Sequence, residues 1–114
     1  MNDAMRKSRA EKILKFGIYI NGLLEHKGDG FSRKVFRRLA DYRRQFKAVA
    51  NDSILSEVLK IDLLIIDEVE QFVAAKNAGD EVGAKRHRAE VIRLWNVGDL
   101  ILNRINEELK NDVF

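Results

Sequence analysis

The chain contains no proline in 114 residues, whereas an average sequence of this length contains about six. Proline interrupts a helix because its ring clashes with the preceding turn and because it lacks the backbone N–H that a helical hydrogen bond needs. No residue of this kind limits helix length here. Apolar residues make up 46% of the chain, which is enough for a core, and the length is that of one domain.

Four segments of the chain carry apolar residues at the three- and four-residue steps that are typical of amphipathic helices. These segments are about residues 6–27, 33–50, 54–78 and 81–110. Short polar turns separate them. The pattern predicts an all-α protein, a single up-down-up-down four-helix bundle over residues 1–114. An open three-helix arrangement is the alternative.

Small polar residues and glycine mark the ends of these segments. Ser32 is a good N-cap for the second helix, and the polar residues 51–53 offer N-caps for the third. Gly79 is expected just after the third helix, because glycine adopts the positive φ that commonly ends a helix. Asp80 is then the expected N-cap of the fourth helix.

The third segment is the most apolar of the four, and its apolar residues form two adjoining stripes. One stripe contains Ile54, Val58, Ile61, Ile65, Val69 and Phe72, and the other contains Leu55, Leu59, Leu63, Ile66 and Val73. Such a helix should be covered on two sides, by sister helices or by another subunit. Trp95, in the fourth segment, is expected in the core, with a subunit interface as the alternative.

Positive charge is concentrated in the second segment, although the net charge of the chain is only +3. Residues 31–51 contain seven basic residues against one acidic residue, Asp41. At about 100° per residue, Arg33, Arg37 and Arg44 fall within roughly 40° of one another on the helix. Lys34, Arg38 and Lys47 flank them. The pattern predicts a basic ridge opposite the apolar stripe, free to bind phosphate groups or neutralised by the acidic third helix.

Two further basic groups accompany this ridge. The fourth helix begins with Lys85, Arg86, His87 and Arg88, and the first segment carries Arg6, Lys7, Arg9, Lys12 and Lys15. Of these we select Lys85, Arg86 and Arg88, together with the ridge, as candidate nucleic-acid contacts. Aromatic side chains do not interleave with the cations of the second helix, so the expected contacts are to the nucleic-acid backbone and sensitive to salt.

Catalytic and metal-binding patterns are not found in the sequence. The chain has no cysteine and two histidines, and it has no glycine-rich phosphate loop. Asp67, Glu68 and Glu70 form a carboxylate cluster without the histidine partner of a di-metal helix pair. We therefore expect no enzyme activity, no metal and no cofactor. The longest apolar run covers residues 63–66 and no secretory signal is visible, so we predict a cytoplasmic protein without membrane association.

Residues 55–73, the polar turn after them and residues 91–105 resemble the accessory variability determinant of diversity-generating retroelements. They are also similar to the related four-helix family encoded in ribosomal-RNA intervening sequences. The similarity in order and spacing spans about residues 10–108. The resemblance implies a non-enzymatic bundle that forms a homopentameric ring, binds RNA and a reverse transcriptase through positive surfaces, and supports error-prone copying of a template repeat.

Two other functions fit the same charge pattern. One is another helical nucleic-acid-binding module, such as the small subunit of a CRISPR effector complex, which polymerises along a guide. The other is a protein-only adaptor or inhibitor whose basic ridge meets an acidic partner. Nucleic acid, and RNA in particular, is the partner that we predict from the sequence.

Overall fold

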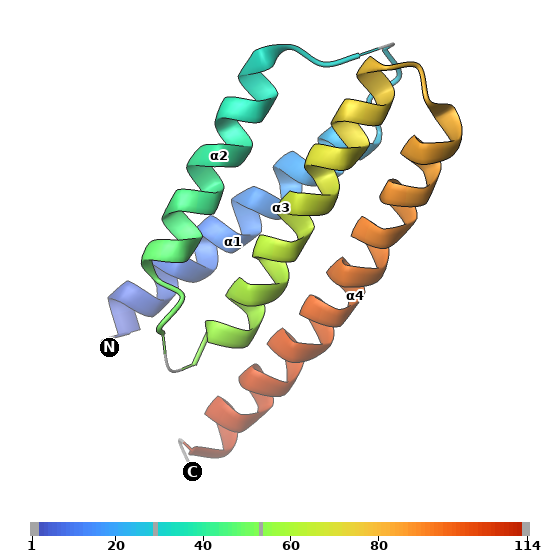
Figure 1. Cartoon of the computed structure of the whole chain (residues 1–114). Coiled ribbons are helices and arrows are strands. Elements are labelled where there is room, and N and C mark those ends of the chain that lie inside the picture. The colour runs from blue at the N-terminus through green and yellow to red at the C-terminus, as the bar shows by residue number, and fades with distance from the viewer. Residues whose placement is uncertain (1–2, 29, 53, 113–114) are drawn as a thin grey trace.

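The computed structural model describes residues 3–28, 30–52 and 54–112, and in this part of the chain it contains helices and no strands. The helices are α1 (Asp3–Leu24), α2 (Arg33–Ala48), α3 (Ser56–Asn77) and α4 (Glu81–Asp112). They run alternately up and down in a bundle that measures 53 × 23 × 19 Å (Figure 1). The prediction of an all-α four-helix bundle is confirmed. None of the described helices is both long enough and apolar enough to cross a membrane.

The helix ends differ from the predicted bounds by a few residues. Helix α1 ends at Leu24, three residues early, where the N–H of His26 bonds the carbonyl of Leu23 in a tighter turn. Ser32 occupies the N-cap position of α2 in an extended conformation, but its side chain makes no capping hydrogen bond. Ser53, one of the predicted caps of the third helix, lies outside the described residues.

The turn between α3 and α4 has the predicted chemistry. Gly79 adopts a φ of 73°, a value that favours glycine over residues with a Cβ. Asp80 then caps α4, because its Oδ1 accepts the N–H of Gly83 at 2.9 Å and its carbonyl accepts that of Ala84. The side chain and the backbone of one residue thus satisfy two amide groups at the start of α4.

Asp52 links α1 to the connection between α2 and α3. Its carboxylate Oδ1 accepts the N–H groups of Ile54 and Leu55 at 2.8 and 2.9 Å, and its Oδ2 lies 2.5 Å from Nη1 of Arg9. Burial raises the pKa of Asp52, but the two amide hydrogen bonds and Arg9 outweigh this effect and lower it. These bonds hold residues 54 and 55 in a turn, so that α3 begins at Ser56 with Leu55 at its N-cap position. The prediction of an N-cap within residues 51–53 is therefore wrong for Asn51 and Asp52, because the turn delays the start of the helix.

The core lies along α3 and is closed by the other three helices. Both apolar stripes of α3 are turned inward, and their fully buried members are Val58, Leu59, Ile65, Ile66, Val69, Phe72 and Val73. The rings of Tyr42 and Phe46 on α2 meet the edge of Phe16 on α1 at centroid distances of 5.0 and 5.1 Å. Sister helices therefore cover α3 on both sides, as predicted.

Helix α1 packs on α4 through a contact between Gly17 and the ring of Trp95. A Cβ added to Gly17 would lie 2.1 Å from Cη2 of Trp95, so the absence of a side chain permits the approach. Trp95 is half-buried. It lines an open groove beside Leu14 and Ile18, which are 64% and 67% exposed. The prediction of a core tryptophan is thus only partly correct, because one side of the ring faces this groove.

We expect Gly17→Ala and Gly22→Ala to change stability in opposite directions. No atom lies within 4 Å of a Cβ added to Gly22, so helix propensity alone should stabilise that variant by about 0.5–1 kcal/mol. In Gly17→Ala the same gain is outweighed by overpacking against Trp95, which costs about 1–3 kcal/mol. Urea unfolding at pH 7 measures both. Equal stabilisation by the two substitutions would contradict the close contact between α1 and α4.

Candidate nucleic-acid interface

Helix α2 presents its cations to solvent along one face. We call Arg33, Lys34, Arg37, Arg38, Arg44 and Lys47 the basic ridge; all six are exposed. The opposite face of the helix carries Leu39, Tyr42 and Phe46, which are buried in the core. The helical period that separates these two faces is the one seen in the sequence. The six ridge residues predicted from the sequence therefore lie on one continuous helix surface.

The acidic third helix binds a different cation of α2. Nη2 of Arg43, which is half-buried, lies 2.7 Å from Oδ1 of Asp67 and 2.5 Å from Oε1 of Glu70. Burial lowers the pKa of Arg43, but its hydrogen bonds to the two carboxylates more than compensate and raise it. Two members of the carboxylate cluster of α3 are thus engaged by Arg43, which is not a ridge residue.

The ridge itself is almost free of ion pairs. Arg44 bonds Asp41 of its own helix, and both side chains are mostly exposed, so that solvent and salt screen the pair. Among the side chains that the structure describes (residues 7–28, 30–52 and 54–108), no carboxylate lies within 4.0 Å of a cationic group of Arg33, Lys34, Arg37, Arg38 or Lys47. The carboxylates of α3 thus neutralise Arg43, which is outside the ridge, and they do not neutralise these five ridge residues.

Arg38 rests on two aromatic rings at the edge of the ridge. Its Cζ lies 5.1 Å from the ring centroid of Tyr19 on α1 and 5.8 Å from that of Tyr42 on α2. Burial raises the pKa of Tyr19, Arg38 lowers it and Tyr42 raises it, with a net increase. The two rings favour a guanidinium at this place through their π faces, while the side chain remains exposed.

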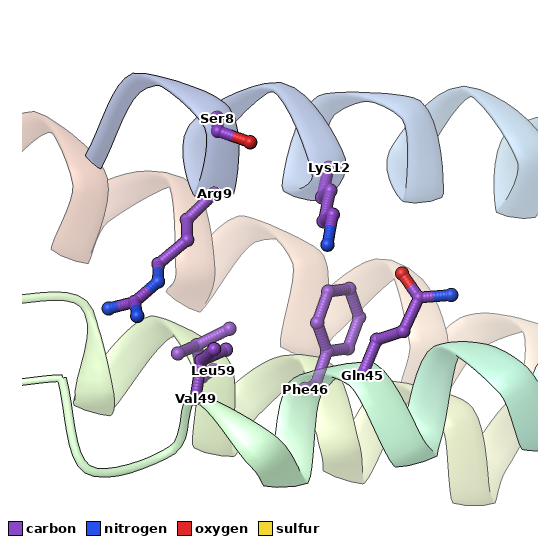
Figure 2. Close-up of a pocket in the computed structure, with 7 residues that line it drawn as sticks. All are labelled: Ser8, Arg9, Lys12, Gln45, Phe46, Val49 and Leu59. Carbon is purple, nitrogen blue, oxygen red and sulfur yellow. The ribbon is translucent and has the colours of Figure 1, made fainter. Parts of the chain in front are cut away.

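The structure extends the basic surface from α2 to α1. Lys12 and Lys15 of α1 line an open groove of about 330 Å³ together with Arg38 and Gln45 of α2; Asp41 is its acidic member. A second groove of about 260 Å³ follows toward the N-terminal end of α1, where Lys12 points toward Phe46 and Gln45, and Arg9, which is bound to Asp52, lies on the side of Val49 and Leu59 (Figure 2). The sequence showed these α1 cations but did not place them beside the ridge. The side chain of Arg6 lies outside the described part.

The basic group of α4 is not part of this surface. Helices α2 and α4 lie on either side of α3, although the starts of both are at the same end of the bundle (Figure 1). Lys85 and Arg86 are exposed, and Arg88 turns toward the end of α1, with its Nε 3.5 Å from the carbonyl oxygen of Leu24. The structure therefore separates Lys85, Arg86 and Arg88 from the six ridge residues.

His87 and His26 have structural contacts. Nδ1 of His87 lies 2.7 Å from Oε2 of Glu68. Glu68 is the third member of the carboxylate cluster of α3, so all three members have a partner. The ring of His26 lies against that of Phe31 at a centroid distance of 4.6 Å. Among the described residues, no group of three or more His, Asp or Glu side chains is arranged to hold a metal ion.

Comparisons of the chain with protein-family models, with curated proteins and with solved structures gave no match.

Proposed function

We propose that this protein is a non-enzymatic accessory protein that binds the phosphate backbone of RNA through the basic ridge and the neighbouring cations of α1. The observation that carries the proposal is the exposure of five ridge cations, none of which contacts a carboxylate among the described side chains. Helix α2 has 16 residues and is about 24 Å long, so its ridge can contact several phosphates in succession. Arginine, which supplies four of the six ridge cations, binds phosphate oxygens bidentately.

The composition of this face favours nucleic acid over an acidic protein. The core of a protein–protein interface is usually built from aromatic and apolar anchors. The aromatic residues Tyr42 and Phe46 of α2 are buried, and Phe36 is the aromatic side chain of α2 that is notably exposed, at 36%. A surface with many cations and few anchors suits a uniform polyanion, whose binding is mainly electrostatic.

The resemblance of the sequence to the accessory variability determinant extends the proposal to a protein partner. In that setting the chain would serve a reverse transcriptase that copies a template repeat, as a ring of identical subunits. The exposed apolar side chains of α1, Leu14 and Ile18, supply a surface for contacts between copies. The second candidate function is that of a helical subunit that polymerises along a guide. It would use the same basic ridge to bind RNA, but it would form an open polymer in place of a closed ring.

Binding of a fluorescent RNA hairpin as a function of salt tests the electrostatic claim. The affinity of the wild-type protein should fall steeply with salt, by about 0.7–0.9 logarithmic units per logarithmic unit of salt for each phosphate contacted. The double variant Arg33→Glu/Arg37→Glu should lower this slope by about 1.5 and weaken binding roughly tenfold or more. Anisotropy titrations at several salt concentrations give both quantities.

The matched control is Lys27→Glu/Lys60→Glu, which changes the net charge equally at two exposed positions outside the ridge. It should retain most of the affinity and the full slope. An equal loss in both double variants, or an unchanged slope in the ridge variant, would contradict the proposal. Light scattering on the same samples separates a closed ring from length-dependent polymers on RNA. Binding to polyglutamate but not to RNA would favour the protein-only adaptor.

A further inference from the structure

A pocket of about 240 Å³ lies between α1, α3 and α4, and no residue of α2 lines it. Its walls are mostly apolar, with Ile13 and Leu14 from α1, Val58 and Ile65 from α3, and Trp95 from α4. Two carboxylic acids interrupt these walls, Asp62 of α3 and Asp99 of α4. The pocket is thus mostly apolar, with one acidic side chain from α3 and one from α4 in its lining, and it is separate from the basic ridge.

Asp62 is a buried acid with an oxygen that finds no hydrogen-bond partner among the described residues. Its side chain lies on the inner face of α3, and the residue is 3% exposed. In the part of the chain that the structure describes, its Oδ2 makes no hydrogen bond. Burial, with a smaller contribution from the nearby Asp99, raises the pKa of Asp62 to about 8. Buried polar groups are nearly always satisfied, so this oxygen on the pocket wall is available to accept a hydrogen bond from a bound molecule.

The chemistry of the lining selects the class of that ligand. Two carboxyl groups disfavour an anion and favour a cation. A calcium ion takes about six to eight oxygen ligands, whereas the lining of this pocket offers side-chain oxygens from Asp62, Asp99 and Asn106. The described residues also contain no group of three His, Asp or Glu side chains arranged to hold a metal ion. The apolar walls suit an aliphatic stem, and the ring of Trp95 favours a cation near its face. An ammonium group has three N–H donors, enough for Oδ2 of Asp62 and for a second acceptor.

We propose that this pocket binds a primary alkylammonium group, with Asp62 as its counter-ion, Asp99 as a second acidic group and the aliphatic stem between α1 and α4. Asp99 is the charged group that faces Asp62 within the pocket; α1 contributes Ala10, Ile13 and Leu14 there, none of which titrates. The inference does not depend on the proposed RNA binding, because the two surfaces share no residue.

Calorimetry with n-butylamine, using the full chain, tests the proposal. We expect saturable binding that rises with pH between 6 and 8, because the ammonium requires the ionised form of Asp62. At pH 7 close to one proton should be released per ammonium bound, as measured in buffers of different ionisation enthalpy. 1-Butanol, which has the same chain without the charge, should bind much more weakly.

The variant Asp62→Asn keeps the shape of the side chain and removes the charge. It should weaken n-butylamine binding about tenfold or more and abolish the proton release. Asp99→Asn should have a smaller effect, because Asp99 is exposed. Equal binding of butanol and butylamine, unchanged binding by Asp62→Asn, or displacement of the amine by calcium ions at comparable concentration would overturn the proposal. Circular dichroism confirms that each variant is folded.

A second arm identifies the source of the ammonium group. Nα-acetyl-lysine methylamide carries the same group on a peptide backbone. If it binds as well as n-butylamine and is equally sensitive to Asp62→Asn, the proposal holds with a lysine side chain of a partner as the ligand. If butylamine alone binds, the proposal holds with a free aliphatic amine as the ligand. If neither binds, the pocket is not an ammonium site.

Discussion

Replacing Asp62 with asparagine should stabilise the protein by roughly 3–5 kcal/mol at pH 9 and change it by less than about 1 kcal/mol at pH 4. The pKa of this group is about 8 in the folded protein and 3.8 in its unperturbed state. Between these values the folded chain holds a proton that the unfolded chain releases. The wild type therefore loses stability as pH rises from about 4 to 8, and then no further through this group.

Urea unfolding at pH 4.5, 7 and 9 measures this difference between wild type and variant. Comparing the two at each pH removes the contributions of the other titrating groups that they share. Asp99→Asn is the matched control, since Asp99 is exposed and contributes less than burial to the pKa of Asp62. A stability difference that is the same at all three pH values would show that Asp62 does not titrate between pH 4 and 9.

Asp52→Ala should destabilise the protein by about 3–4 kcal/mol at pH 7. The substitution removes the acceptor of two amide hydrogen bonds in the turn before α3, and hydrogen bonds to a charged acceptor are worth about 1–2 kcal/mol in total here. It also removes the buried carboxylate that lies against Arg9, and because the Arg9 side chain is 23% exposed and stays partly hydrated, this loss costs less than breaking a fully buried ion pair. The amide hydrogen bonds and the ion pair involve the same residue, so one substitution loses both contributions.

Two controls separate these contributions in the same urea experiment. Asp52→Asn keeps an oxygen for the amides of Ile54 and Leu55 and should lose about 1–2 kcal/mol. Asp80→Ala removes the exposed cap of α4, with an expected loss of about 1 kcal/mol. The pKa of Asp52 is lowered in the folded protein, so the ionised carboxylate stabilises the fold above pH 4. This stabilisation is lost as the pH falls below that value and the carboxylate is protonated. If Asp52→Ala lowers the free energy of unfolding by no more than Asp80→Ala does, the ion pair between Asp52 and Arg9 adds nothing to stability.

The basic ridge shows how far a sequence can predict a candidate site. The angular spacing of Arg33, Arg37 and Arg44 follows from the helical period, so their common outward face could be predicted as soon as the helix was recognised. Which cation meets the carboxylates of α3 could not, because that depends on the rotation of α2 against α3. The structure assigns this contact to Arg43. It also places Lys12 and Lys15 beside Arg38, a neighbourhood between residues more than 20 positions apart in sequence.

The spacing of Asp62 in the sequence indicates that it is buried, but the many charges around it obscure this indication. It follows Val58 by four residues and precedes Ile65 by three, so that it lies within the apolar stripe of α3. It is also one of seven acidic residues in 52–80, so the overall charge of this segment hides its place in the stripe. The helical period places it on the inner face, but only the packing of α1 and α4 over that face shows that its Oδ2 finds no partner among the described residues.

The sequence by itself determined the number and approximate extent of the helices, the turn at Gly79 and Asp80, and the face of α2 that carries the ridge. These properties depend on local backbone preferences and on the helical period, which act within a few residues of the chain. The tertiary structure alone decided the pairs Arg43 with Asp67 and Arg9 with Asp52, and the contact of Gly17 with Trp95. Each of these joins residues on different helices, and their distances depend on how the helices pack against one another.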